Sequence, residues 1–201
     1  MPRTDERGGP QTRKRISDIA TAMFLERGFD AVTVAEVARA AGVSSVTVFN
    51  HFARKEDLLF DREEDAVELL RSAVRDRGDL TMLESLQQAA IHLFEAQHAL
   101  AAVDSRSVPF FRTVAESATL VARVRVITAD LQRALATELD RDPAFESDGT
   151  LAAALFIAGY STVLTENARR LISGEAPESV AADHLERLER LFGTLRSGIS
   201  S

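Results

Sequence analysis

Residues 33–59 read TVAEVARAAGVSSVTVFNHFARKEDLL, and this stretch decides the fold. It opens on a Thr-x-x-Glu capping box, in which the Thr33 hydroxyl accepts the Glu36 backbone N–H and the Glu36 carboxylate accepts that of Thr33. The box predicts a short helix of about two turns. This helix should end at Gly42, because glycine adopts the left-handed conformation of a helix end at little cost.

A second short helix is expected after the glycine turn, over residues 45–52. Ser44 is a good N-cap for it, because a serine oxygen can accept the free backbone N–H of Thr47 in the first turn. Two short helices that meet at a tight glycine turn, after a longer helix, form a helix-turn-helix. If Val48 and Phe52 are buried, the outer face of the second helix carries Ser45, Val46, Thr47, Phe49, Asn50 and His51.

That outer face, with Ser44 at its start, suits the major groove of DNA, which admits a helix with small hydroxyl, apolar and amide side chains. Asn50 is the strongest candidate for reading a base, because its amide can pair bidentately with adenine. Ser45 or Val46 can meet a thymine methyl group. Lys55 is expected at the start of the next helix, where free backbone N–H groups help a lysine to hold a phosphate.

This region resembles the N-terminal DNA-binding domain of the tetracycline-repressor (TetR) family. The resemblance covers about 45 of the 201 residues. The matching elements are Phe24-Leu25-Glu26-Arg27-Gly28-Phe29 at the end of a first helix, then Thr33, Ala38 to Ser44, Thr47 to Phe52, and Lys55-Glu56-Asp57-Leu58-Leu59.

The resemblance implies contacts with the sugar-phosphate backbone from four positions: Thr33, Thr47, His51 and Lys55. Simpler roles stay open, because either threonine can serve only as a cap and the histidine can be a partly buried helix-end residue. Two positions depart from the family pattern. Phe49 stands where the family usually has Tyr and so lacks a hydroxyl donor, and Arg54 replaces the small polar residue that usually caps the next helix.

The whole chain predicts an all-α fold, in which an N-terminal three-helix helix-turn-helix domain precedes a larger helical domain, with about nine helices in total. Apolar residues recur every three or four positions throughout. The expected domains are a disordered arm over 1–10, the DNA-binding domain over 11–54 and a regulatory and dimerisation domain over 55–201. The helices outside the central pair are expected over 12–27, 55–77, 82–101, 105–115, 120–139, 148–173 and 177–198.

The resemblance implies a ligand cavity and a homodimer in the larger domain. Aromatic and titratable residues on otherwise aliphatic helices are the pocket candidates: Phe94, His98, Phe110, Phe111 and Tyr160. An apolar stripe on the last two helices is the candidate dimer interface: Phe156, Leu185, Leu188, Phe192 and Leu195. The stripe has an alternative explanation as the core of one chain, and each pocket candidate as an ordinary core or surface residue.

Composition narrows the function classes. Hydrophobic residues make up 45% of the chain and charged residues 27%, which is ordinary for a globular protein, and cysteine is absent. No apolar run is expected to cross a membrane, and we expect a cytoplasmic protein without a metal or cofactor. The net charge is −7, but residues 1–60 hold nine basic and eight acidic side chains, against 15 and 23 in the remainder. Near the N-terminus only two acidic residues stand against a cluster of five basic ones: Arg3, Arg7, Arg13, Lys14 and Arg15. This bias is consistent with a DNA-binding region at the N-terminus, and a solvated arm with a chance distribution of charge stays open as the alternative.

The sequence contains no glycine-rich phosphate loop after a strand and no Gly-x-Ser-x-Gly elbow, so we expect a regulator and not an enzyme. The main hypothesis is a repressor that a small, mostly apolar ligand releases from a near-palindromic DNA operator. Two other hypotheses stay open. One is a DNA-binding regulator of the same fold without a small-molecule effector, and the other is an all-α interaction protein whose helix-turn-helix is structural.

Overall fold

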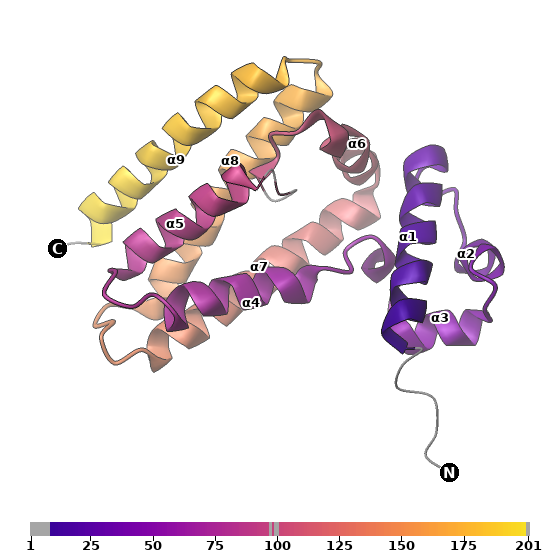
Figure 1. The fold of residues 1–201 in the computed structure, drawn as a ribbon, viewed down its shortest axis with the longest axis horizontal. Helices are drawn as coiled ribbons and strands as arrows, with labels where there is room; N and C mark the ends of the chain where they lie inside the picture. The colour runs from indigo at the N-terminus through magenta and orange to yellow at the C-terminus, as the bar shows by residue number, and fades with distance from the viewer. Residues whose placement is uncertain (1–8, 97, 99–100, 200–201) are drawn as a thin grey trace, which may run out of the picture. The chain divides into compact units, whose positions relative to one another are not determined.

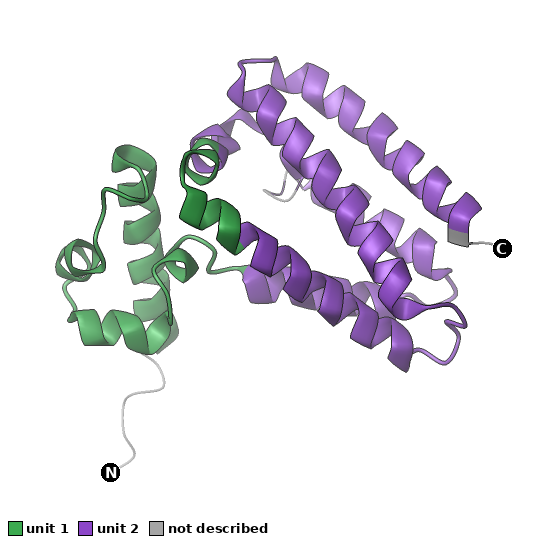
Figure 2. Cartoon of the chain, turned by 180° about the vertical axis from the view of Figure 1, so that it is seen from behind, with its two compact units in different colours: residues 1–62, 112–123 green, residues 63–111, 124–201 purple. Residues whose placement is uncertain are grey.

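The computed structural model describes residues 9–96, 98 and 101–199, and every regular element among these residues is a helix (Figure 1). The chain divides into two compact units (Figure 2). Unit 1 comprises residues 1–62 and 112–123, and unit 2 comprises 63–111 and 124–201. This division differs from the predicted boundary after residue 54 in two respects. The N-terminal part of unit 1 extends to residue 62, and the later segment 112–123 also belongs to unit 1.

Unit 1 is built on three helices: α1 (Gly9–Arg27), α2 (Val34–Ala40) and α3 (Ser45–His51). The two short helices pack against each other and against α1 (Figure 1). Their shared core includes Ile16, Phe24, Val37, Val48 and Phe52, all at most 2% exposed. The predicted helix-turn-helix is therefore present. Helix α1 begins earlier than expected, at Gly9, so the last two residues of the predicted arm are helical and residues 1–8 lie outside the described residues.

The long helix predicted over 55–77 is wrong, because the structure has a 3-10 turn, η1 (Glu56–Leu58), and a separate helix, α4 (Glu63–Arg75). The Leu58 carbonyl accepts a hydrogen bond from the Ser17 hydroxyl at 3.3 Å, which uses an acceptor that a continuous helix would need. Leu58 and Leu59 are both buried in succession. Adjacent residues of a helix point in directions about 100° apart, so one face of a straight surface helix does not bury both of them. The burial of both leucines therefore agrees with a turn at this point.

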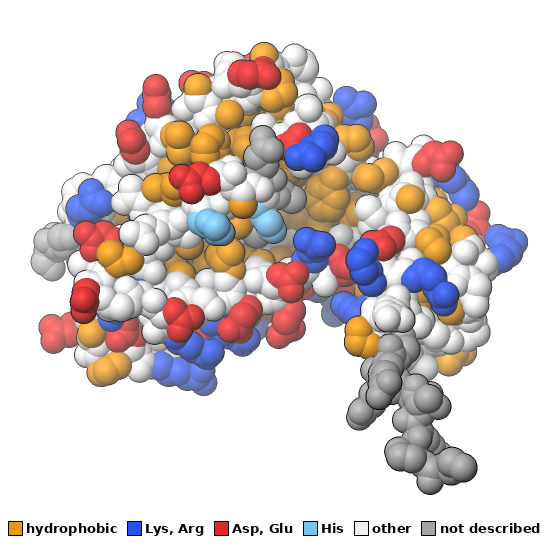
Figure 3. Space-filling model, in the orientation of Figure 1, with side chains coloured by type: hydrophobic (Ala, Val, Ile, Leu, Met, Phe, Trp, Pro, Cys, Tyr) orange, Lys and Arg blue, Asp and Glu red, His pale blue; other side chains and the backbone are white. Residues whose placement is uncertain are grey.

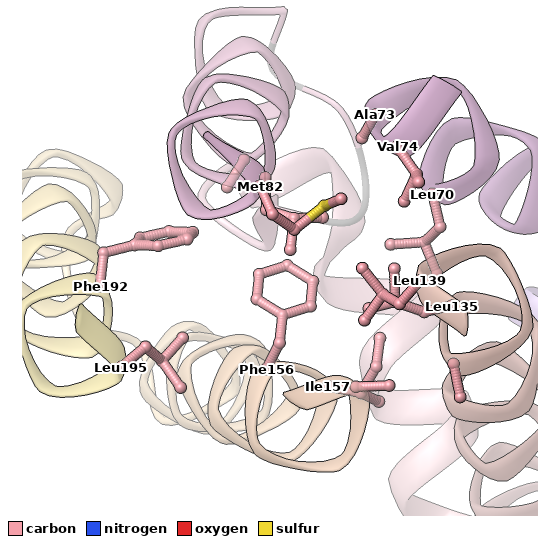
Figure 4. Close-up of a cluster of buried hydrophobic side chains, with 14 of the residues drawn as sticks. Leu70, Ala73, Val74, Met82, Leu135, Leu139, Phe156, Ile157, Phe192 and Leu195 are labelled. Atoms are coloured by element: carbon pink, nitrogen blue, oxygen red, sulfur yellow. The ribbon is translucent and has the colours of Figure 1, made fainter. Parts of the chain in front are cut away.

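Unit 2 contains α4, α5 (Met82–Glu95), the start of α6 (Val108–Glu116), most of α7 (Ala118–Arg141), α8 (Gly149–Ile172) and α9 (Pro177–Ile199). A short 3-10 turn, η3 (Ser105–Ser107), precedes α6. The core of unit 2 gathers apolar side chains from α4, α5, α7, α8 and α9 (Figure 4). The labelled members include Leu70, Met82, Leu135, Phe156 and Phe192.

Helix α5 is shorter than the predicted 82–101, since it ends at Glu95. The backbone N–H of Ala96 donates to His92 and that of His98 donates to Leu93 at 2.9 Å, which closes the last turn. His98 therefore lies beyond the helix on which it was predicted. No glycine or proline marks this end, so periodicity alone extended the helix too far.

Helix α8 is long and apolar enough to cross a membrane by length and composition, against our expectation from the sequence. In the structure it is a core helix that buries Phe156, Ile157 and Val163. At Gly159 it approaches α9 closely, because an added Cβ would lie 2.3 Å from a methyl group of Leu191. Gly159 thus serves the packing of α8 on α9 within one chain.

Most of the predicted dimer stripe is the core of a single chain, which was the alternative explanation. Phe156, Leu188, Phe192 and Leu195 are between 1% and 6% exposed. Only Leu185, at 37%, is exposed to solvent. The error has a physical cause, since an apolar stripe at helical spacing does not distinguish a buried face from an interface between copies.

Candidate nucleic-acid interface

Helix α2 is held at its start by the predicted capping box. The Glu36 backbone N–H donates to the Thr33 hydroxyl at 3.2 Å, and the Thr33 N–H donates to the Glu36 carboxylate at 2.8 Å. Arg27 of α1 donates to the same carboxylate at 2.8 Å. The hydrogen bond from Arg27, followed by those from Thr33, lowers the pKa of Glu36 to about 2. The box thus also links α2 to the end of α1.

Helix α3 is fixed at both ends. The Thr47 N–H donates to the Ser44 hydroxyl at 3.0 Å, as the sequence predicted, and the two hydroxyls lie 2.9 Å apart. At the other end the Arg13 guanidinium lies 4.3 Å from the centroid of the Phe52 ring and donates to the His51 carbonyl. Cation–π contact and a charge-assisted hydrogen bond hold this end of α3 against α1.

The outer face of α3 exposes apolar side chains beside an amide. Val46 is 69% exposed and Phe49 is 53% exposed, and Asn50 is exposed next to them. Ser45, Thr47 and His51 are half-buried on the flanks. The face therefore matches the predicted combination of methyl, ring and amide groups. Such groups suit thymine methyl and adenine edges in a major groove.

Lys55 lies in a different setting from the one predicted. It precedes the 3-10 turn and not a helix start, so no helix end assists it. Its ammonium donates to the Phe29 carbonyl at 2.6 Å and lies 4.1 Å from the Phe29 ring centroid. Burial lowers the pKa of Lys55. An ammonium has three N–H donors, so one bond to Phe29 leaves donors for a phosphate.

A later part of the chain braces the helix-turn-helix within unit 1. Ser117, between α6 and α7, donates to the Asp30 carboxylate at 3.2 Å. Arg123 of α7 pairs with Asp57 of η1 at 3.1 Å, and both side chains are mostly buried. No sequence signal pointed to these contacts, because the partners are distant in the chain and of ordinary types.

Arg13 is a second residue whose role the sequence did not reveal. The sequence placed it only in a basic N-terminal cluster, whereas in the structure it supports the end of α3 through Phe52. Arg13 lies three residues before the buried Ile16 on α1, and this helical spacing was the available signal that its side chain lies near the core of unit 1. Its contact with Phe52 depends on tertiary packing and could not be predicted from the sequence.

The structure separates the predicted pocket residues into different contacts. Phe94 stacks on His184 with ring centroids 5.2 Å apart, Phe110 meets Phe111 at 5.6 Å, and Tyr160 stacks on Phe156 at 6.0 Å. His98 is half-buried after α5, and burial raises the pKa of Tyr160. A common pocket for these residues stays a prediction.

Two clefts of unit 2 are lined by other residues. One, of about 720 Å³, runs between α4 and α5 and is bordered by Asp65, Glu68 and Asp76. Figure 3 shows acidic side chains along this part of unit 2. The other, of about 590 Å³, is bordered by Arg75, Arg141 and further residues of α4 and α7. Both are open and charged and do not resemble the expected apolar pocket.

Comparison with known proteins agrees with this geometry. Residues 16–61 match the family described as bacterial regulatory proteins, tetR family. The HTH-type transcriptional repressor KstR2 of Mycobacterium tuberculosis is 37% identical over 86 residues, which cover 42% of this chain and 43% of that protein. The HTH-type transcriptional regulator AcrR of Shigella flexneri is 27% identical over 99 residues, 48% of this chain and 46% of that protein. The chain thus spans about half the length of the curated relatives it matches.

Solved structures extend the likeness of fold to most of the chain. SmeT, the repressor of a Stenotrophomonas maltophilia multidrug efflux pump, in complex with triclosan, is 21% identical with a TM-score of 0.63 and covers 92% of this chain and 91% of its own. FadR of Thermus thermophilus in complex with lauroyl-CoA is 23% identical with a TM-score of 0.52, covering 88% of this chain and 92% of its own. With its capped helix-turn-helix and its matching family segment, the part of this chain over residues 16–61 belongs to the tetR family of bacterial regulatory proteins, and the all-helical fold of the chain agrees with that of the solved structures.

Proposed function

We propose that this chain is a cytoplasmic transcriptional repressor that binds double-stranded DNA through α3 and leaves it when a small molecule binds unit 2. The observation that carries the proposal is the outer face of α3. A seven-residue helix that is fixed at both ends leaves the side chains of Val46, Phe49 and Asn50 exposed in the described part of unit 1. DNA supplies methyl groups and adenine edges that match them.

A homodimer on a near-palindromic operator follows from the size of α3. One short helix reads only a few base pairs, and two-fold dimers place two such helices in successive major grooves. We propose that the dimer surface uses the exposed leucines of α8 and α9. Leu151 is 57% exposed, Leu155 is 45% exposed and Leu185 is 37% exposed.

Substitution of one of these leucines tests the dimer. Leu155→Glu places a charge in the proposed interface and should convert the dimer to a monomer in sedimentation at micromolar concentration. Val126→Glu is the matched control, because Val126 is 43% exposed on α7 and is not part of the proposed surface. A wild-type monomer at this concentration, or equal behaviour of the two variants, contradicts the proposed interface.

Selection of bound fragments from genomic DNA tests the DNA-binding function itself. We expect a near-palindromic consensus and an affinity that falls steeply with salt, because phosphate contacts release counterions. The local basic residues near Arg13 and Lys55 act in spite of the net charge of −7, since charges farther away than about 8 Å are screened at physiological ionic strength. Absence of binding to any duplex at low salt overturns the proposal.

The effector is proposed to be a small, mostly apolar molecule. Its support is the apolar core among α4, α5, α7, α8 and α9, together with triclosan and lauroyl-CoA in two structures of similar fold. Coupling of this kind is typically about 1–3 kcal/mol, which corresponds to a shift of roughly 5- to 150-fold in operator affinity. By linkage, DNA must weaken the ligand by the same factor. Equal ligand affinities with and without operator contradict a regulatory role.

A further inference from the structure

The loop after α3 carries an exposed arginine that no contact within the chain employs. Phe52 is the C-cap of α3, and Arg54 follows two residues later, before Lys55 and η1. The Arg54 side chain is exposed, and among the described residues its guanidinium has no hydrogen-bond, ion-pair or ring partner. A guanidinium has five N–H donors and no acceptor, so all five are available to an external acceptor.

Other cations of unit 1 already have partners within the chain. The Arg13 guanidinium is held at the end of α3, where it lies over a ring and donates to a carbonyl. Lys14 donates to the Asp18 carboxylate at 2.6 Å. The Lys55 ammonium donates to the Phe29 carbonyl at 2.6 Å. Arg54 differs from these three cations because every donor of its side chain is free.

The hydroxyl donors of the helix-turn-helix are largely committed as well. The Thr33 hydroxyl donates to the Glu36 carboxylate at 2.8 Å, so its single hydrogen is used. The Ser44 and Thr47 hydroxyls lie 2.9 Å apart and use one hydrogen on each other. The exposed ring of Phe49 carries no hydroxyl. Any firm hold on a sugar-phosphate backbone therefore needs a further donor, and the guanidinium fork matches two phosphate oxygens.

The backbone at Arg54 is fixed although its side chain is free. The Arg54 backbone N–H donates to the Asp57 carboxylate at 3.1 Å. Asp57 also pairs with Arg123 of α7 at 3.1 Å, and both of these side chains are mostly buried. Asp57 thus caps the turn from its far side, and the turn needs no capping side chain at residue 54. A side chain on a fixed backbone loses less conformational freedom when it binds a partner.

The dimensions of α3 bring Arg54 within reach of a phosphate. Its seven residues span about 10 Å at a rise of about 1.5 Å per residue, and a major groove is about 12 Å wide. Both ends of such a helix in the groove therefore lie within about one groove width of a sugar-phosphate strand. Arg54 lies three residues after His51, the last residue of α3, which is at most about 10 Å of extended chain. Arg15 and Arg39 are exposed too, but they lie within α1 and α2 and not directly after α3.

We propose that Arg54 is a phosphate-binding residue whose guanidinium donates to the DNA backbone at the C-terminal end of α3, beside Lys55. The inference rests on the proposed function, because it assumes that α3 lies in a major groove. Phosphate oxygens only accept hydrogen bonds, which matches a group that only donates them. The contact carries no base preference, because a phosphate occurs at every step of the duplex. Arg54 then adds affinity, while the outer face of α3 reads the sequence.

Arg54→Ser in the full chain separates this contact from a role in folding. Serine caps a turn well, so the free energy of unfolding in urea should equal that of the wild type or exceed it. The affinity for the selected duplex, measured by fluorescence anisotropy, should fall about tenfold, as expected for loss of a charge-assisted hydrogen bond. The slope of log affinity against log salt should flatten by about one unit per half-site. Arg54→Lys keeps the charge and should keep the wild-type slope.

Arg133→Ser is the matched control, because it removes an exposed arginine of α7 within unit 2 and should leave the DNA affinity and the salt slope unchanged. An equal loss of affinity in both variants, or a loss of stability in Arg54→Ser, overturns the inference. A changed base preference at one position in Arg54→Ser overturns it too, because that result assigns the guanidinium to a base. Absence of DNA binding by the wild type would overturn the proposed function and this inference with it, whereas wild-type affinity and slope in Arg54→Ser would overturn this inference alone.

Discussion

The outer face of α3 in unit 1 and the buried contact between α8 and α9 in unit 2 differ in where they leave apolar and polar groups. In unit 1 the supporting polar groups of α2 and α3 are paired, as at Thr33 with Glu36, while the apolar Val46 and Phe49 face solvent. In unit 2 the apolar side chains fill the core, while one polar atom each of Asn167 and His184 is buried there without a hydrogen-bond partner among the described residues. Unit 1 thus presents a fixed, exposed face on α3, whereas the Asn167–His184 contact of unit 2 lies inside an apolar core.

Removal of one core aromatic ring from each unit should give the largest loss of stability and should separate the roles of the two units. Phe52→Ala and Phe192→Ala each delete a ring that is at most 2% exposed and should destabilise the affected unit by about 3–5 kcal/mol. Only Phe52→Ala removes the surface against which Arg13 holds α3. We expect loss of DNA binding with retained helicity of unit 2, measured by anisotropy and circular dichroism.

The contrasting variant Phe192→Ala should lower the unfolding temperature of unit 2 and leave the contacts within unit 1 intact. Unchanged DNA affinity in Phe52→Ala would show that α3 does not depend on this ring. That result would remove the argument that a fixed α3 carries function.

The pH dependence of stability tests whether His184 is buried as a neutral imidazole. Burial lowers the pKa of His184 to about 4, against an unfolded value of about 6.5. Below pH 6.5 the unfolded chain binds a proton that the folded chain refuses, so stability should fall between pH 6.5 and pH 4, by roughly 2–3 kcal/mol. In His184→Phe this loss should disappear, as judged by urea unfolding at pH 7 and pH 4.5. An identical loss in wild type and variant would contradict the burial of a neutral imidazole.

Paired helix caps provide the smallest test. Thr33 caps α2 in unit 1 and Thr81 caps α5 in unit 2, each with a glutamate three residues on. Alanine at either position should cost about 1 kcal/mol of stability. Only Thr33→Ala should also weaken DNA binding, because α2 positions the turn before α3. Equal DNA affinity of the two variants would contradict the idea that the Thr33 cap supports the DNA-binding surface.

The same caps respond to acid in a different range from His184. Hydrogen bonds from Arg27 and then Thr33 lower the pKa of Glu36 to about 2, and a hydrogen bond from Thr81 lowers the pKa of Glu84. Both carboxylates therefore stabilise the folded chain above about pH 4.5, and this contribution is lost as the pH falls toward 2. Glu36→Gln should reduce the loss below pH 4 and leave the range from 6.5 to 4 unchanged.

The sequence predicted unit 1 better than unit 2 for a physical reason. Capping residues and Gly42 act on their immediate neighbours, so Thr33, Ser44 and the glycine turn located α2 and α3. Helical periodicity in unit 2 located the helices but not their ends, and α5 stopped at Glu95 without a breaker residue.

The buried polar residues of unit 2 depend on partners distant in the sequence. His184 follows the spacing of the buried stripe, four residues before Leu188, and that spacing was the signal for its burial. Its contact with Asn167 and the free atoms of the pair arise only from packing of α8 on α9. The prediction of the dimer stripe was wrong for the same reason, because most of its residues pack against distant residues of the same chain.

Base preference in Asn50→Ala and Lys55→Ala tests the central claim most directly. Both variants and the wild type would be used to select DNA from one random duplex library, and the affinities would be measured over a range of salt. We predict that Asn50→Ala loses preference at one position in each half-site, at a cost of about 1–3 kcal/mol, while Lys55→Ala weakens all sequences alike and flattens the salt slope by about one unit per half-site. An unchanged base preference in Asn50→Ala, or the same change in both variants, would contradict the claim that the exposed face of α3 reads DNA.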